Sequence, residues 1–329
     1  MPVFLCARPL MQALLDAIAT LTPPVEACRI FHGRGGRFPG SEQWTLDAYP
    51  PVLVLTSFAP VTDDALATID GALRARWQQV APGQPLNWVF QHRGEALRIE
   101  GRSDTRLMAG EVPEPHVVTE DGARLRVQVL RGQNHGLFLD MAEGRRWVRA
   151  HVANHRARTG RGARVLNLFA YTCAFSVAAL QAGAAEVVNV DMSRGAIATG
   201  QQNHQLNGLG AGARFLAHDI FSSWGKITRS GPYDLVIVDP PSYQKGSFVA
   251  TKDYARLMRR LPELLIPRGH ALLCLNAPEL GMEFLCEQMR SQAPSLAFVE
   301  RVPNPAVFAD VDEERSLKVL VFRDTAAVG

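Results

Sequence analysis

From residue 164 to residue 323 the sequence alternates between short apolar runs and amphipathic segments, which constrains the fold more than any other feature. Strands are predicted at 165–169, 187–191, 214–218, 235–239 and 271–275, and helices near 172–182, 193–207, 251–265 and 279–292. Apolar strands that alternate with helices are typical of a parallel sheet covered on both faces. Two last strands, at 298–301 and 316–322, have no helix between them, which predicts one antiparallel strand at the C-terminus.

The first 114 residues have a different pattern and are predicted to form a small α+β domain. Helices are expected at 8–21 and 62–80, and strands at 28–32, 51–58 and 88–92. A polar connector then leads into a second domain, 115–329, which opens with a hairpin at 117–130. The Asp121-Gly122 pair predicts its turn, because Gly readily adopts positive φ. The sequence therefore predicts an α/β, Rossmann-like domain preceded by a small α+β domain.

Composition excludes several classes of protein. Of the 329 residues 47% are apolar and 20% are charged, as in ordinary globular chains. The apolar runs are too short to span a membrane and no targeting segment is recognised, so a cytoplasmic location is expected. The five cysteines include no C-x-x-C pair, which argues against a disulfide framework and against a thiolate zinc site. No metal is predicted.

Three acidic residues stand at the ends of three predicted strands: Asp191, Asp219 and Asp239. In an open α/β sheet, ligands bind beyond the carboxyl ends of the strands. Singly, Asp191 could cap the following helix and Asp219 could cap a turn. Together, three carboxylates at one edge of a sheet would repel one another, so we interpret them as a binding site.

A nucleoside cofactor explains this set of carboxylates. Asp191 would accept hydrogen bonds from both ribose hydroxyls, and Asp219 would reach the adenine amino group. A dinucleotide would require a glycine-rich turn for its pyrophosphate, but residues 167–175 contain no Gly. The sequence therefore favours S-adenosylmethionine over a nicotinamide dinucleotide, and a methyltransferase over an oxidoreductase.

The segment Asp239-Pro240-Pro241-Ser242-Tyr243 directly follows the fourth predicted strand. Two prolines fix φ and remove two N–H donors, which gives a stiff loop. Such a loop can hold carbonyl groups against a planar nucleophile, and Tyr243 could stack on an extruded base. A structural turn with a surface tyrosine is the alternative. We predict that Asp239, Pro240, Pro241 and Tyr243 form the catalytic loop.

The net charge is only +3, but its distribution is uneven. Residues 122–164 contain ten Arg and only two acidic residues, Asp140 and Glu143. This excess could neutralise phosphates, which favours contact with a nucleic acid over a merely solvated helix face. RNA contacts are expected to include Arg145, Arg146 and Arg149.

Residues 117–323 resemble the bacterial large-subunit ribosomal RNA methyltransferases that make 5-methylcytosine or 7-methylguanine, which are class I S-adenosylmethionine enzymes. The matching stretches are Gly136-Leu-Phe-Leu-Asp140, Leu166-Asn-Leu-Phe-Ala-Tyr-Thr172, Val190-Asp-Met-Ser193, Asn203 with Leu206-Asn-Gly-Leu209, and Asp239-Pro-Pro-Ser-Tyr243. The resemblance implies ribosomal RNA as the partner. The residues expected to bind the cofactor are Phe138, Asp140, Asn167, Phe169, Ala170, Tyr171, Asp191, Met192, Asp219 and Ile220.

Departures from the family pattern define the alternatives. Cys173 stands where the family's first turn has Gly, so the turn could differ in shape and the chain could be a non-catalytic cofactor-binding module. Ala142 replaces a basic residue that often follows Leu139-Asp140. Asn276 takes the place of the thiol used by the cytosine-C5 members, and Cys274 lies two residues earlier. We therefore expect methylation of a base nitrogen, with guanine favoured. A small-molecule or protein substrate remains an alternative.

Overall fold

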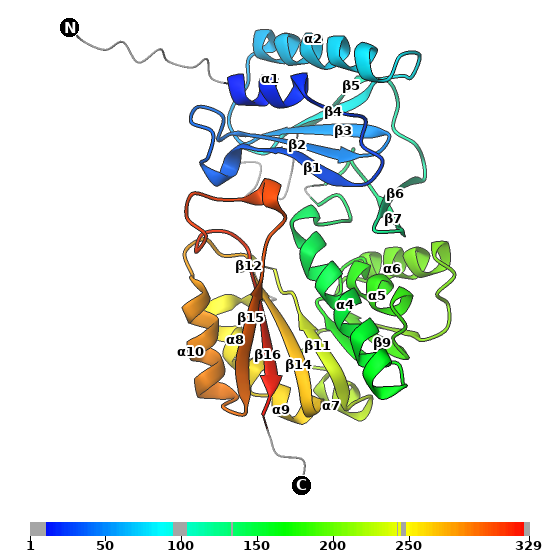
Figure 1. Cartoon of the computed structure of the whole chain (residues 1–329), viewed down its shortest axis with the longest axis vertical. Helices are drawn as coiled ribbons and strands as arrows, with labels where there is room; N and C mark the ends of the chain where they lie inside the picture. The colour runs from blue at the N-terminus through cyan, green and yellow to red at the C-terminus, as the bar shows by residue number, and fades with distance from the viewer. Residues whose placement is uncertain (1–10, 95–103, 133, 242, 245–247, 326–329) are drawn as a thin grey trace, which may run out of the picture. The chain divides into compact units, whose positions relative to one another are not determined.

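The computed structural model describes residues 11–94, 104–132, 134–241, 243–244 and 248–325, without the side chains of 243 and 244. The chain divides into two compact units (Figure 1). The first unit comprises Met1–Gly122, Arg126–Leu139 and Ala306–Val311. The second comprises Ala123–Leu125, Asp140–Pro305 and Asp312–Gly329. This division differs from the expected boundary between residues 114 and 115, because later segments of the chain return to the first unit.

The first unit is built on a five-stranded sheet with the order β1-β2-β3-β4-β5. Its strands are β1 (Cys28–His32), β2 (Trp44–Tyr49), β3 (Val52–Ser57), β4 (Asn87–His92) and β5 (Asp104–Ala109). Only β3 and β4 are parallel to each other; the other neighbours are antiparallel. Helices α1 (Gln12–Ala19) and α2 (Asp63–Val80) lie on one face of the sheet (Figure 1). Both helices share one apolar core with it. The small α+β unit is thereby confirmed.

The sequence pattern does not predict β2 or β5. Every residue of β2 is buried, including Asp47, whose carboxylate lies 2.6 Å from the Arg29 guanidinium. A strand buried on both faces does not alternate, and this carboxylate interrupts its apolar run. β5 lies at an edge of the sheet and contains no buried residue, so it has no buried apolar face to recognise.

Residues beyond 114 join the first unit through specific contacts. The Tyr49 hydroxyl donates to the Leu137 carbonyl oxygen at 3.3 Å, and the side-chain amide of Gln91 donates to the Gly132 carbonyl oxygen at 3.1 Å. The Val311 amide donates to the Gly35 carbonyl oxygen at 2.9 Å. The predicted hairpin is present as β6 (His116–Glu120) and β7 (Ala123–Val127). Its turn places both Asp121 and Gly122 at positive φ, 47° and 76°.

The second unit contains a seven-stranded sheet with the order β10-β9-β8-β11-β14-β16-β15. The strands are β8 (Arg164–Leu168), β9 (Glu186–Asp191), β10 (Ala213–Ala217), β11 (Tyr233–Val238), β14 (Leu265–Leu275), β15 (Leu296–Val302) and β16 (Lys318–Asp324). β16 runs antiparallel to both of its neighbours, and β8, β9, β10, β11 and β14 are parallel. The predicted Rossmann-like sheet with an antiparallel C-terminal strand is confirmed.

Helices cover both faces of this sheet (Figure 1). They are α4 (Ala142–Thr159), α5 (Ala174–Gln181), α6 (Arg194–Leu206), α7 (Trp224–Arg229), α8 (Ala250–Met258), α9 (Leu261–Leu264) and α10 (Met282–Gln292). Alternate residues of each strand enter different cores. In β11, Val236 and Val238 pack with α8, α9 and α10, whereas Leu235 and Ile237 pack with α4 and α5. This burial on both faces explains the continuous apolar strands.

The strand order reverses between β8 and β11. From β8 the chain builds β9 and β10 on one side, and then crosses to β11 and β14 on the other. Leu168 and Val238, the last residues of β8 and β11, are paired neighbours. Ligands of open α/β sheets bind in the crevice beyond such a switch point, so the segments that follow these two strands form the candidate site.

Candidate active site

The turn after β8 places three non-glycine residues in the left-handed region. Phe169, Tyr171 and Cys173 have φ of 56°, 47° and 62°. For an L-residue this conformation costs about 1–2 kcal/mol, so the surrounding contacts must hold it. The Ala170 amide donates to the Val190 carbonyl oxygen at 3.0 Å, and the Cys173 amide donates to the Ala170 carbonyl oxygen at 2.7 Å. Cys173 thus adopts the conformation that a glycine would adopt freely.

Asp191, the last residue of β9, fixes two loops at once. Its Oδ2 accepts a hydrogen bond from the Tyr171 amide at 2.8 Å, and its Oδ1 accepts one from the Ser193 amide, also at 2.8 Å. Each carboxylate oxygen has two acceptor positions, so one remains on each oxygen for a pair of hydroxyl groups. The neighbouring Met192 side chain is 50% exposed at this edge. Asp191 therefore holds two loops in place and still has acceptor positions for the hydroxyl groups of a ribose.

Asp219 follows β10 and shapes its own turn. Its Oδ1 accepts a hydrogen bond from the Ser222 amide at 2.8 Å, as the capping alternative predicts. Its side chain is half-buried, and Oδ1 alone makes this contact. Ile220 beside it is 3% exposed and belongs to the core that includes α8 and α10. An adenine amino group could use the second oxygen of Asp219.

The side chain of Asn167 points into the sheet, and its predicted contact with the cofactor stays a prediction. Its side chain is 1% exposed and donates to Asn189 Oδ1 at 2.9 Å. Asn189 in turn donates to Ser176 Oγ at 3.0 Å. Ser176 Oγ lies 2.9 Å from His204 Nε2, while His204 Nδ1 lies 2.7 Å from the Gly200 carbonyl oxygen. Since only a protonated Nδ1 can donate to that carbonyl, Nε2 accepts from Ser176, and Asn167 begins a buried polar chain.

Asp239 stands directly after β11 beside a second carboxylate. Burial and the charge of Asp140 raise its pKa to about 7, although the Arg145 guanidinium and a hydrogen bond from the Cys274 thiol act in the opposite direction. Asp140 lies at the start of α4, in the 3-10 turn Leu139–Met141. The raised pKa means that the ionised form of Asp239 is disfavoured here, and a nearby positive charge would stabilise that form. This end of β11 therefore favours a cationic ligand.

Cys274 lies on β14 with its thiol toward Asp239. The side chain is 1% exposed, and burial together with the charges of Asp239 and Asp140 raises its pKa well above the usual value. The Tyr254 hydroxyl donates to the Cys274 carbonyl oxygen. The sequence suggests only a buried apolar role for this cysteine. Its contact with Asp239 joins two strands and has no signal in local sequence.

The loop after Asp239 is anchored by an aromatic residue that the sequence does not single out. Pro240 is buried and Pro241 half-buried, while Ser242 and the side chain of Tyr243 lie outside the described residues. The backbone of Tyr243, in β12 (Tyr243–Gln244), pairs with β13 (Phe248–Val249). The Phe248 ring packs edge-on against Phe169 at 5.3 Å between centroids. Phe248 therefore connects the predicted catalytic loop to the turn after β8.

Comparison with known proteins identifies the family. A family model described as S-adenosylmethionine-dependent methyltransferase matches residues 28–323. The chain belongs to this family. The family's cofactor is S-adenosylmethionine, which favours this cofactor over a nicotinamide dinucleotide.

Relatives of this methyltransferase include enzymes named for ribosomal RNA. Ribosomal RNA large subunit methyltransferase I of Aeromonas salmonicida is 30% identical over 76% of this chain and 61% of its own length. Ribosomal RNA large subunit methyltransferase K/L of a Psychrobacter species is 36% identical over 56% of this chain and 22% of its own length. The structure of SMU.776 complexed with SAH has a TM-score of 0.74 and is 25% identical, over 95% of this chain and 80% of its own. The chain thus spans about three fifths of the first of these relatives.

The strand-end residues of the methyltransferase fit its cofactor. The sulfonium of S-adenosylmethionine is a cation, and it would stabilise the ionised form of Asp239, whose pKa burial and the charge of Asp140 raise. The ribose requires paired acceptors, which Asp191 retains next to the turn at Tyr171. Of the remaining predicted contacts, Phe138 is 43% exposed and belongs to the first unit.

The Arg-rich segment 122–164 presents fewer arginines at the surface for RNA than its sequence predicts. Arg145 is 3% exposed, so it cannot be an RNA contact and that prediction is wrong. It lies on the buried stripe of α4 with Val148 and Val152, whose spacing from Arg145 is helical. Arg146 pairs with Glu143 at 2.6 Å, and Arg149 donates to the side chain of Gln181. Arg146 and Arg149 remain at the surface. Within the part of the chain that the structure describes, no helix is long and apolar enough to cross a membrane.

Proposed function

We propose that this methyltransferase acts on ribosomal RNA and transfers the methyl group to a base nitrogen, with guanine as the favoured base. The names of its relatives support the RNA substrate. The buried, protonated thiol of Cys274 is the observation that favours a base nitrogen over cytosine C5 as the methylated atom. Methylation at cytosine C5 requires a thiolate that adds to C6 and so makes C5 nucleophilic. Cys274 is 1% exposed with a raised pKa, so the protonated thiol is strongly favoured and is shielded from a substrate.

The position expected for such a thiol supports the same choice. Asn276 follows β14 and is exposed at the ligand edge of the sheet. An amide does not add to a pyrimidine ring, but it can donate and accept hydrogen bonds at a base edge. Of the three other described cysteines, Cys28 belongs to the first unit, Cys173 is buried behind the turn after β8, and Cys286 is buried on α10. A ring nitrogen needs no covalent help, since its lone pair can attack a methyl group directly.

The chain's own residues would position the base and receive its proton. S-adenosylmethionine supplies the electrophilic methyl group when bound. The Asp239 carboxylate would accept a hydrogen bond from an N–H of the base, which raises the electron density on that nitrogen. If an exocyclic amine is methylated, one N–H proton must leave, and Asp239 with a pKa of about 7 suits that transfer. Pro240 and Pro241 lack N–H groups, so their carbonyl groups are the backbone's only hydrogen-bonding groups there.

The decisive experiment compares ribosomal RNA from cells with and without this protein. We expect one methylated nucleoside, on a base nitrogen, to be absent from large-subunit RNA of the deletion strain. Recombinant protein and tritiated S-adenosylmethionine should restore it, and Asp239→Ala should not. Unchanged RNA from the deletion strain would favour a small-molecule or protein substrate. Loss of 5-methylcytosine would contradict the choice of nitrogen while leaving the RNA substrate in place.

A further inference from the structure

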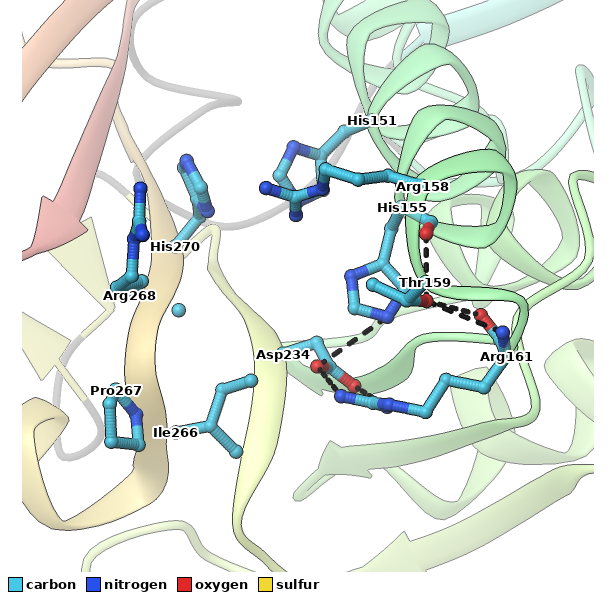
Figure 2. Close-up of a pocket in the computed structure, with 11 residues that line it drawn as sticks. His151, His155, Arg158, Thr159, Arg161, Asp234, Ile266, Pro267, Arg268 and His270 are labelled. Carbon is cyan, nitrogen blue, oxygen red and sulfur yellow. Dashed lines mark hydrogen bonds and ion pairs between the residues drawn. The ribbon is translucent and has the colours of Figure 1, made fainter. Parts of the chain in front are cut away.

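A second pocket lies at the opposite ends of the strands from the cofactor site. Asp234, near the start of β11, lies on its wall, whereas Asp239 follows the last residue of that strand. The pocket has a volume of about 300 Å³. Residues from the C-terminal half of α4 and from the first half of β14 complete it (Figure 2). Nothing in the methyltransferase reaction described above uses these residues.

The walls of the pocket carry more positive than negative charge. Its charged side chains are three guanidiniums, Arg158, Arg161 and Arg268, and one carboxylate, Asp234. Arg161 donates to both oxygens of Asp234, at 2.8 and 2.6 Å, so these two charges cancel (Figure 2). Arg158 and Arg268 are exposed, and neither pairs with a carboxylate among the described residues. Two uncompensated cations therefore border one cavity.

Three imidazoles add neutral hydrogen-bonding groups. The rings of His151 and His270 meet edge-on at 4.5 Å between centroids (Figure 2). The pKa of His151 is lowered to about 3 and that of His270 to about 4, chiefly by burial and in smaller part by neighbouring positive charge that includes Arg158. Each ring is therefore neutral near pH 7 and presents one N–H donor. His155 Nε2 is buried without a hydrogen bond, 3.6 Å from Asp234 Oδ1.

The backbone holds Arg268 in an unusual conformation. Its φ is 66°, in the left-handed region, between Pro267 and Gly269. Its amide donates to Asp324 Oδ2 at 3.2 Å, which helps to fix the turn. Figure 2 shows Arg268 and His270 on β14, across the pocket from His151 and Arg158 on α4. The two guanidiniums thus approach the same space from two elements of the second unit.

We propose that this pocket binds the phosphate group of a nucleotide, with Arg158 and Arg268 as its charged ligands and the imidazoles as neutral donors. Guanidiniums match the oxygens of a phosphate in pairs, and an excess of positive charge balances its charge. A pocket of about 300 Å³ has room for the phosphate together with its ribose. The phosphate could belong to an RNA strand or to a free nucleotide, which share this chemistry. The anion site itself does not depend on the proposed RNA substrate.

The test uses the full chain with saturating S-adenosylhomocysteine, so that a nucleotide cannot bind at the cofactor edge. Calorimetry measures binding of inorganic phosphate, of adenosine 5′-monophosphate and of a 12-nucleotide RNA. The variant combines Arg158→Gln with Arg268→Gly, because glycine tolerates positive φ and preserves the turn. The matched control is Arg229→Gln, an exposed arginine at the end of α7 that does not line the pocket. Thermal unfolding verifies that each variant is folded.

We expect the nucleotide to bind the parent and the control, and the double variant to bind it at least tenfold more weakly. If affinity for the RNA falls in parallel, the phosphate comes from a polynucleotide; if RNA binding is unchanged, it comes from a free nucleotide. The proposal is overturned if the double substitution changes the binding of neither phosphate, nucleotide nor RNA. If the parent binds the nucleotide at this pocket but methylates no ribosomal RNA, the proposed function fails while the phosphate site stands.

Discussion

The Cys173 thiol occupies the space that a side chain at Gly200 would need. A Cβ built on Gly200 would lie 2.5 Å from Cys173 Sγ, and Gly200 stands in the interior of α6. Cys173 begins α5 with a left-handed φ of 62° and is completely buried. The cysteine that departs from the family's glycine is thus accommodated by a glycine on the neighbouring helix. This pairing explains how the turn after β8 keeps its shape without a glycine of its own.

The pairing predicts a coupled effect on stability. Gly200→Ala should destabilise the second unit by about 1–3 kcal/mol, the usual cost of overpacking a core. In a Cys173→Gly background the sulfur is gone, and Thr172 C is the nearest remaining atom at 3.4 Å, so the same substitution should cost much less. Gly195→Ala, on the same helix with nothing within 4 Å, serves as the control and should gain up to about 1 kcal/mol. Urea unfolding of the four variants measures the coupling, and additive effects would contradict it.

Asp191 is predicted to control affinity for S-adenosylmethionine. Removal of charged hydrogen bonds to the ribose should cost about 1.5–3 kcal/mol, so Asp191→Ala should bind at least about tenfold more weakly in calorimetry. Because Asp191 also holds the amides of Tyr171 and Ser193, local structure needs its own control. Ser193→Ala removes the cap of α6 but leaves the carboxylate. It should lower stability by about 1 kcal/mol and preserve affinity. Equal binding by Asp191→Ala and the parent would rule out the ribose contact.

Much of the second unit can be predicted from its sequence, because the order of strands and helices alone determines which residues lie at the ends of strands. Asp191 is the last residue of a parallel strand, and Asp219 and Asp239 follow two others at the same edge. The direction of a side chain cannot be predicted in the same way. Asn167 lies one residue before the end of β8, and its amide turns sideways to Asn189 on β9. Sequence does not reveal such a pairing, since it depends on which strands are neighbours.

Helix α4 shows where charge patterns mislead. Arginine-rich composition suggests a solvated or RNA-binding face, but burial depends on which residues share a stripe. Arg145 shares its stripe with Val148, Val152 and His155, all buried. The helical spacing of the two valines from Arg145 is the signal that could have identified it. Likewise, the pocket between α4 and β14 joins residues more than a hundred positions apart, and no local pattern predicts it.

The pKa of Asp239 predicts a dependence of stability on pH. Its folded pKa of about 7 lies above the unfolded value of about 3.9. The folded state therefore prefers the protonated acid, and the stability that this provides is complete below about pH 4 and declines as the pH rises to about 7. Asp239→Asn should abolish this decline, so the stability difference between variant and parent should increase between pH 4 and 7.5. Urea unfolding across this range measures it. A constant difference would show that Asp239 ionises normally.

Catalysis should show the opposite trend with pH. If the Asp239 carboxylate accepts a proton or a hydrogen bond from the base, kcat/KM should rise with pH through the region near 7 and then level off. A bound sulfonium would favour the ionised form of Asp239, so the pH at the midpoint of the rise should be lower for kcat than for kcat/KM. Asp239→Asn should be slow and should lack this dependence. A parent profile that is flat between pH 5.5 and 8.5 would exclude Asp239 from proton transfer.

Substitution of Cys274 best distinguishes methylation of a base nitrogen from methylation of cytosine C5. Because its thiol donates to Asp239 and lowers that pKa, Cys274→Ala should retain methyl transfer while shifting the rising limb of the pH profile upward. Cys286→Ala, at a thiol whose pKa Asp239 does not affect, is the control and should leave the profile unchanged. Radiolabelled methyl transfer to the RNA, followed by nucleoside mass spectrometry, reports both rate and product.

A nucleophilic cysteine would behave differently: Cys274→Ala would be inactive, the parent would yield 5-methylcytosine, and a covalent RNA adduct could be trapped. Those results would replace nitrogen methylation with a C5 mechanism and would require the buried thiol to become exposed when RNA binds.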